Sequence, residues 1–233
     1  MAGERRSGLI AALDTADVAQ AQRWADAVLP PCGMVKLGLE FFLANGPDGV
    51  RALGERPLFL DLKLHDIPNT VAGAVRSILR LRPRLLTLHA AGGAAMLAAA
   101  RDAAATAGDA RPLLLAVTVL TSLDAAALGA TGVLDPPDAQ VLRLARVALA
   151  AGCDGLVCAP TEVAMLRTAL GPAPLLVVPG IRPAGGAADD QARTLTPRAA
   201  AEAGADWLVV GRPITQAPDP HAAVAAIAAE IGA

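Results

Sequence analysis

The chain has 233 residues, of which 54% are hydrophobic and 18% are charged, and its formal net charge is -2. This composition allows a sizeable core and excludes a disordered chain. Only 2% of the residues are aromatic, tyrosine is absent and there is no basic excess, so we expect no nucleic-acid partner. No stretch resembles a signal peptide, no apolar run approaches the ~18 residues of a membrane span, and the cysteines lack zinc-ligand spacing. We therefore expect a cytoplasmic protein with free thiols and no membrane partner.

Short apolar runs alternate along the chain with stretches of helical spacing. The apolar runs are typical of buried strands, because they are short and bounded by turn-forming residues. We predict strands at residues 9–14, 34–39, 58–64, 85–90, 113–120, 155–159, 175–178 and 207–210. We predict the intervening helices at residues 17–29, 40–54, 69–81, 93–107, 137–151, 161–170, 197–203 and 220–231.

This alternation of eight strands with eight helices predicts an α/β protein with a (β/α)8 (TIM) barrel. The length suits a single domain of this kind over residues 1–233. An open, doubly wound parallel sheet is the alternative. We favour the barrel because no glycine-rich dinucleotide fingerprint follows the first strand.

Three charged residues gather where the third predicted strand ends. Asp61 and Lys63 lie two positions apart and therefore share one face of the strand, and Asp66 follows at the turn before the next helix. Of the 20 Lys and Arg residues only Lys36 and Lys63 are lysines, and both lie near predicted strand ends. Unlike arginine, lysine can be tuned to release a proton. A structural ion pair is the alternative, but clustered charges at a strand end favour a functional site.

In a (β/α)8 barrel the carboxyl ends of the strands carry the active site, and the loops after strands seven and eight commonly bind phosphate. Gly180 and Arg182 follow the seventh predicted strand, and Gly211 and Arg212 follow the eighth. Glycine N–H groups and an arginine fork fit an anion. We expect the loop at residues 182–193 to close as a lid. The alternative is that these glycines only form tight turns.

The stretch FLDLKLHDIPNT at residues 59–70 resembles the signature of bacterial-like orotidine 5′-phosphate decarboxylases, with its Asp-x-Lys-x-x-Asp core. Further motifs follow in the order of that family. They are ALD at 12–14, VKLGLE at 35–40, HAAGG at 89–93, VTVLTS at 117–122, VPGIRP at 178–183, DDQAR at 189–193 and VVGRPIT at 209–215. The resemblance covers the chain from the first strand to the eighth. It departs at Val178, where the family pattern has a small polar residue.

The resemblance implies a carboxy-lyase that converts orotidine 5′-phosphate to UMP, the last step of de novo pyrimidine synthesis, with no metal and no other cofactor. It implies that Lys63 protonates the carbanion at C6 of the pyrimidine and that Asp61 faces the departing carboxylate. It also implies a homodimer, in which Asp66 and Thr70 reach into the partner's site. The other implied contacts are Asp14 and Lys36 to the ribose, Thr121 to the pyrimidine, and Arg182, Gln191, Gly211 and Arg212 to the phosphate.

Two other functions are weighed against this one. A related decarboxylase or aldolase would act on a sugar phosphate with Mg²⁺, held by an acid at the position of Lys36; a lysine there repels the metal. A barrel retained only to bind a phosphate ligand or to act as a scaffold would tolerate loss of motif residues, and none is lost.

Overall fold

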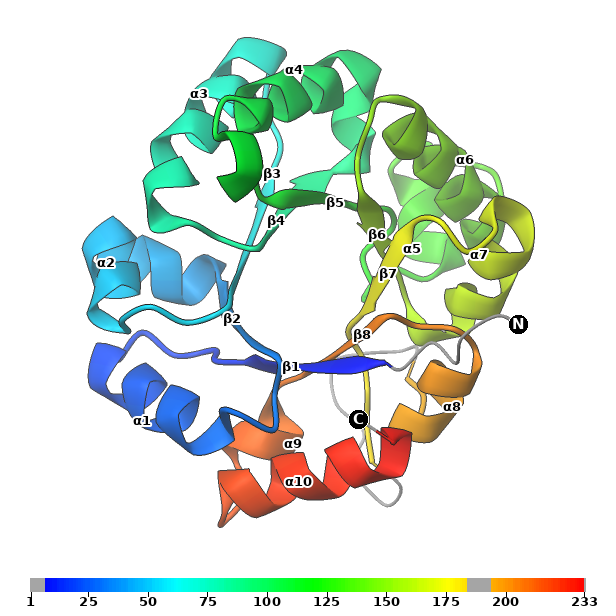
Figure 1. Ribbon diagram of the computed structural model, residues 1–233. Coiled ribbons are helices and arrows are strands. Elements are labelled where there is room, and N and C mark those ends of the chain that lie inside the picture. The colour runs from blue at the N-terminus through cyan, green and yellow to red at the C-terminus, as the bar shows by residue number, and fades with distance from the viewer. Residues whose placement is uncertain (1–6, 184–193, 233) are drawn as a thin grey trace.

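The computed structural model describes residues 7–183 and 194–232. Eight parallel strands form a closed barrel in chain order, and β8 pairs with β1 to complete it (Figure 1). The predicted (β/α)8 fold is confirmed. The strands are β1 Gly8–Ala12, β2 Met34–Gly38, β3 Leu58–Leu64, β4 Leu85–His89, β5 Leu113–Val117, β6 Gly155–Val157, β7 Leu175–Val178 and β8 Trp207–Val210.

Helices surround the barrel, as the view along its axis shows (Figure 1). They are α1 Val18–Val28, α2 Leu39–Ala52, α3 Pro68–Ile78, α4 Gly93–Ala105, α5 Ala125–Ala130, α6 Pro137–Ala150, α7 Val163–Leu170, α8 Pro197–Glu202, α9 Arg212–Thr215 and α10 Pro220–Ile231. Short 3-10 turns lie at Leu79–Leu81, Ala90–Gly92, Gly108–Ala110 and Pro160–Glu162. None of the helices in the described ranges has both the length and the apolar character of a membrane span.

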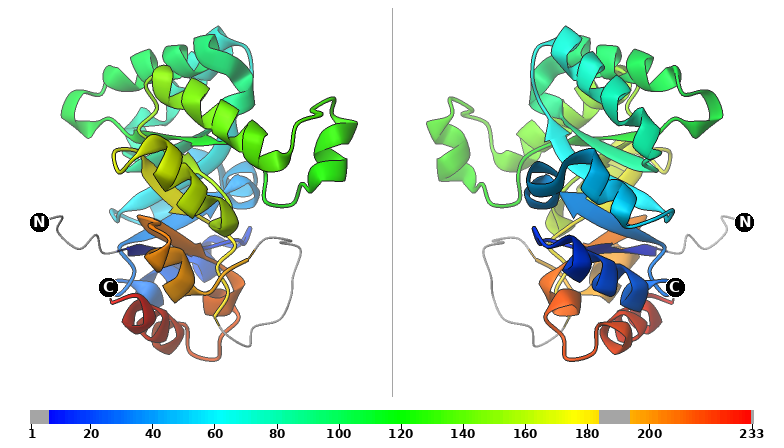
Figure 2. Two further views of the ribbon diagram at one scale, coloured as in Figure 1. Left: turned by 90° about the vertical axis from the view of Figure 1, so that its right-hand side faces the viewer. Right: turned by 90° about the vertical axis from the view of Figure 1, so that its left-hand side faces the viewer.

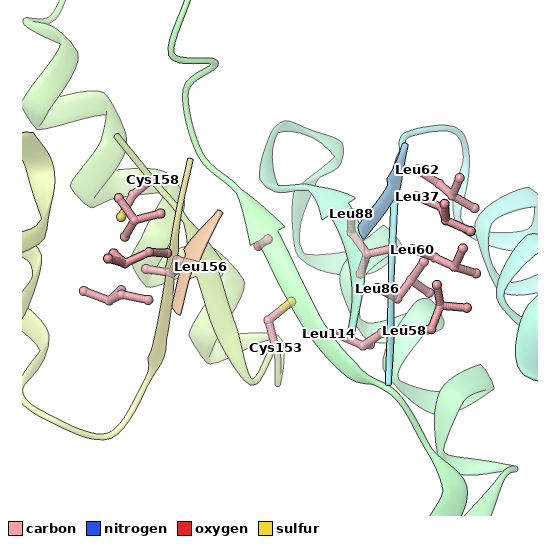
Figure 3. Packing of buried hydrophobic residues seen from close by; sticks show 14 of the residues in the cluster. Leu37, Leu58, Leu60, Leu62, Leu86, Leu88, Leu114, Cys153, Leu156 and Cys158 are labelled. Atoms are coloured by element: carbon pink, nitrogen blue, oxygen red, sulfur yellow. The ribbon is translucent and has the colours of Figure 1, made fainter. Parts of the chain in front are cut away.

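Side-chain alternation along the strands produces two apolar layers. Ile10, Met34 and Phe59 belong to the cluster that fills the barrel interior. The residues between them on the strands belong to the larger cluster beneath the helices, in which leucines of β2, β3 and β4 pack together (Figure 3). Both faces of each strand are thus buried, which explains why the strands read as nearly continuous apolar runs.

Two ion pairs lie at the amino edge of the barrel and hydrogen-bond to the backbone of β5 and β7. The Asp154 carboxylate accepts a hydrogen bond from the N–H of Leu114 at 2.8 Å and pairs with Arg111. Asp206, just before β8, accepts one from the N–H of Leu176 and pairs with Arg167. These carboxylates satisfy backbone donors at this edge of the barrel, whereas the charged residues at the opposite edge face a cavity.

The structure corrects the sequence prediction between β5 and α6. The strand predicted to continue to residue 120 ends at Val117. The segment beyond it contains α5, which the prediction missed, and this segment projects from the barrel in both side views (Figure 2). Asp124 caps α5 by accepting a hydrogen bond from the N–H of Ala127 at 2.8 Å. The Asp cap and the alanines favour a helix even in this short segment.

Candidate active site

Four charged side chains of alternating sign meet at the carboxyl edge of the barrel. The Lys36 ammonium lies 3.1 Å from Oδ1 of Asp14 and 3.5 Å from Oδ2 of Asp61. The Lys63 ammonium lies 2.8 Å from Oδ1 and 2.9 Å from Oδ2 of Asp61. The structure therefore brings together four of the predicted site residues, from the neighbouring strands β2 and β3 and the loop after β1.

Strand register explains this meeting. Ala12, Met34 and Phe59 point into the barrel, and the next inward positions along the same chain segments are Asp14, Lys36 and Asp61. The interior layer thus changes from apolar to charged at its carboxyl edge. The side chains of Lys36 and Asp61 are only 9% and 13% exposed. Each charge is therefore stabilised by the opposite charge more than by water.

Burial and charge act in opposite directions on Asp61. Burial alone would raise its pKa, but the positive charges of Lys36 and Lys63 outweigh burial and hold the pKa below its ordinary value. For Lys36 burial would lower the pKa, and the carboxylates of Asp61 and Asp14 instead raise it. Both groups therefore stay ionised at neutral pH, as a compensated buried network requires.

Two site residues escaped the sequence analysis. One is Thr87 on β4, whose buried hydroxyl accepts a hydrogen bond from the Lys63 N–H at 2.8 Å and donates one to Oδ1 of Asp61 at 2.9 Å. Its signal in the sequence is a lone hydroxyl in the apolar run LLTLH. The other is Gly38, where an added Cβ would lie 3.2 Å from the Lys36 ammonium. Glycine there leaves room for that ammonium.

A cavity of about 510 Å³ opens over the charged network. Its lining includes most of the predicted site residues: Asp14, Lys36, Asp61, Lys63, Thr121, Arg182, Gly211 and Arg212. Gly180 also lines it and has a positive φ of 81°, a conformation that glycine adopts without strain. The groups expected to bind phosphate thus follow β7 and β8, and the charged network comes from β2, β3 and the loop after β1.

Two predicted residues in the described part of the chain do not line this cavity. Asp66 and Thr70 are exposed in the turn and first helical residues after β3, and within the described chain neither lines the cavity. The Asp66 carboxylate accepts a hydrogen bond from the N–H of its neighbour Ile67 at 2.6 Å. Gln191 and most of the expected lid fall within residues 184–193, which are outside the described residues.

The fold and site together define a (β/α)8 barrel with a charged cavity of small-molecule size at its carboxyl edge. Residues 7–227 match the profile of the Orotidine 5′-phosphate decarboxylase / HUMPS family, so the chain belongs to this family. An orotidine 5′-phosphate decarboxylase of Anaeromyxobacter sp. (strain K) is 58% identical over 223 residues, which cover 95% of this chain and 96% of the relative. One of Gluconobacter oxydans is 56% identical over 231 residues, 97% of this chain and 98% of the relative.

The fold agrees with solved structures of the same family. The crystal structure of orotidine 5′-phosphate decarboxylase from Lactobacillus acidophilus superposes with a TM-score of 0.86 at 39% sequence identity. The match covers 98% of this chain and 100% of that protein. The family resemblance and the predicted barrel are both confirmed, whereas the roles of individual residues stay predictions.

Proposed function

We propose that this chain is a single-domain orotidine 5′-phosphate decarboxylase that forms UMP and CO2 in the last step of pyrimidine nucleotide synthesis. The observation that carries the proposal is the array of Asp14, Lys36, Asp61 and Lys63, which lines one cavity together with Arg182 and Arg212. Relatives that cover at least 95% of the chain at more than half identity bear the name of this enzyme. The two lines of support are independent, since the first comes from geometry and the second from sequence.

The proposed chemistry follows from the charges. Loss of CO2 leaves an electron pair on C6 of the pyrimidine, and the barrier is the formation of this carbanion. The Lys63 ammonium would stabilise the developing negative charge and then transfer a proton to C6. Asp61 would face the departing carboxylate, and the charges of Lys36 and Lys63 would keep Asp61 ionised there. Closing the cavity to water would strengthen each of these interactions.

The phosphate of the substrate would bind away from the reacting carbon. Arg182 and Arg212 line the cavity together with Gly180 and Gly211, which supports phosphate binding by guanidinium groups and backbone N–H groups. Gln191 is proposed to join them from the lid, and Thr121 to bind the pyrimidine. Binding energy from the distant phosphate can be used to order the lid and align C6 with Lys63.

We further propose a homodimer in which Asp66 and Thr70 complete the partner's site. Both residues are exposed and lie outside the cavity of their own chain, which supports a role in another subunit. Large apolar side chains are exposed at the same end of the barrel: Leu39 is 47% exposed, Leu43 is 79% and Ile67 is 67%. A second subunit over this surface would remove them from water.

We propose a cytoplasmic location, which the buried free cysteines support.

An Mg²⁺-dependent reaction on a sugar phosphate is the second candidate, because the matched family also includes HUMPS proteins. Lys36 argues against it. The Lys36 ammonium lies between the carboxylates of Asp14 and Asp61, and a cation there competes with a divalent metal for both.

An assay separates these candidates and the scaffold alternative. The purified protein is mixed with orotidine 5′-phosphate with and without EDTA, and UMP and CO2 are quantified. We expect equal turnover in both samples. Turnover of a sugar phosphate with Mg²⁺ that EDTA abolishes, without turnover of orotidine 5′-phosphate, would favour the metal-dependent reaction. Absence of turnover, with the ligand still bound, would favour the binding protein.

A further inference from the structure

We propose that Thr87 is a positioning residue, whose hydroxyl fixes the backbone of Lys63 and the carboxylate of Asp61 relative to each other. This inference rests on the proposed decarboxylase function for its catalytic consequence. Thr87 does not line the cavity within the described residues, so it acts through its neighbours.

The backbone of Lys63 needs such a fixed partner. Lys63 has a φ of +47°, in the left-handed region that residues with a side chain rarely adopt. The pairing between β3 and β4 shifts register between Leu60 and Leu64, as at a β-bulge. A bulge releases backbone groups from the ladder, and here the side chain of Thr87 accepts the hydrogen bond of the Lys63 N–H.

The direction of each hydrogen bond is determined. A backbone N–H can only donate, so the Thr87 oxygen must accept from Lys63 at 2.8 Å. The hydroxyl proton is then available for the carboxylate, and Oδ1 of Asp61 lies 2.9 Å away. One buried hydroxyl, 0% exposed, thus joins the backbone of the proposed proton donor to the carboxylate that its ammonium contacts.

Each partner has a different consequence for the proposed reaction. Holding the Lys63 N–H preserves the bulge that directs its side chain toward the cavity. Holding Oδ1 of Asp61 prevents the carboxylate from rotating away from the two ammonium groups, and the hydrogen bond also helps to keep the pKa of Asp61 low. Such an outer partner is expected to affect the chemical step more than the binding of substrate.

The kinetic test uses three variants. Thr87→Val keeps the shape of the side chain but cannot hydrogen-bond, and Thr87→Ser keeps the hydroxyl. Thr118→Val is a matched control, because Thr118 is a buried threonine whose hydroxyl donates to the carbonyl of Val157 and does not contact the charged network. From the free energy that a hydrogen bond to a charged group contributes, we expect Thr87→Val to lower kcat roughly 10- to 100-fold. KM should change by less than about threefold. Thr87→Ser and Thr118→Val should stay within about threefold of the parent protein.

A second readout does not depend on turnover. Lys63 follows Leu62 and Lys36 follows Val35, so 15N-lysine with 13C-carbonyl-leucine labelling identifies the Lys63 amide signal in the intact protein. Thr87→Val should move this signal upfield and speed its hydrogen exchange at least ~10-fold, and Thr87→Ser should restore both. The Lys36 amide serves as the internal reference.

The outcomes separate the two hypotheses. An inactive parent protein would refute the proposed decarboxylase, and the amide measurement would still decide the role of Thr87. An active parent with unchanged kcat in Thr87→Val, an unchanged Lys63 amide, or equal damage in Thr87→Ser and Thr87→Val would each overturn the positioning role.

Discussion

The ammonium of Lys63 contacts both carboxylate oxygens of Asp61, at 2.8 and 2.9 Å, although the two residues are only two positions apart on β3. In a regular strand the Cα atoms of such residues lie ~6.6 Å apart, and their side chains extend side by side from the same face. The left-handed φ of Lys63 and the register shift toward β4 interrupt that regularity. Strain of this kind, of order 1–3 kcal/mol, is found where function requires it. The strand thus presents an ion pair, with Lys63 30% exposed and Asp61 13% exposed.

Replacing Lys63 should separate catalysis from folding. We expect Lys63→Ala to abolish turnover while leaving the fold and most phosphate-driven binding intact. The reason is that the residues proposed to bind phosphate follow strands other than β3. Lys63→Arg should fail as well, since a guanidinium does not readily release its proton. Turnover, thermal unfolding and UMP binding are measured on the same samples. Near-normal turnover in a verified Lys63→Ala protein would refute its assignment as proton donor.

Replacing Arg212 should weaken binding of the phosphate. Arg212→Ala should remove the proposed charge-assisted contact to phosphate, worth about 1.5–3 kcal/mol, so KM should rise roughly 10- to 100-fold with a smaller change in kcat. Arg146→Ala is the control, because this arginine is exposed on α6 and lies outside the cavity. A substrate without phosphate should be insensitive to both changes. Equal loss with both substrates would show instead that Arg212 supports structure.

The charged network should also give the stability of the protein a defined pH dependence. The pKa of Asp61 is lowered from 3.8, so its stabilising contribution is present above that pH and is lost as pH falls through the lower, folded value. The pKa of Lys36 is raised from 10.5, so its contribution is present below that pH and is lost as pH rises through the higher, folded value. The contribution of both groups should therefore be constant between these limits.

Urea unfolding from about pH 3 to about pH 9 checks the acid side of this dependence. Asp61→Asn should reduce the free energy of unfolding at neutral pH by about 3–5 kcal/mol, because it leaves buried ammonium groups with one partner fewer. The variant should also lose less stability than the parent protein between neutral and acid pH. Asp109→Asn, at an exposed aspartate, controls for the general effect of charge. Parallel curves for Asp61→Asn and the parent would contradict a lowered pKa at Asp61.

Part of this site could be predicted from the order of strands and from alternation. Because strand side chains alternate, the sequence predicted that Asp61 and Lys63 share one face of their strand, and the two side chains are in contact in the structure. The bulge at Lys63 and the hydroxyl of Thr87 could not be predicted, because the contact joins residues 24 positions apart and depends on the register of β3 against β4. The helix α5 was missed because its six residues are too short for a periodic pattern.

The proposed exchange of Asp66 between subunits predicts that two inactive variants will complement each other. We expect Lys63→Ala and Asp66→Ala each to be inactive or nearly so alone. In a mixed dimer one site collects both defects. The other site takes intact Lys63 from the Asp66→Ala chain and intact Asp66 from the Lys63→Ala chain. With random exchange at equal amounts, half of the dimers are mixed and half of their sites are intact, so roughly a quarter of the parent activity should return.

The two variants are unfolded or diluted together, allowed to reassociate, and assayed for decarboxylation, while native mass spectrometry measures the fraction of mixed dimers. Each variant carried through the same procedure alone is the control, because refolding by itself must not restore turnover. Recovered activity should rise in proportion to the mixed fraction, since only a mixed dimer contains an intact site. If mixed dimers form and no activity returns, Asp66 serves the site of its own chain or the site is not shared between subunits.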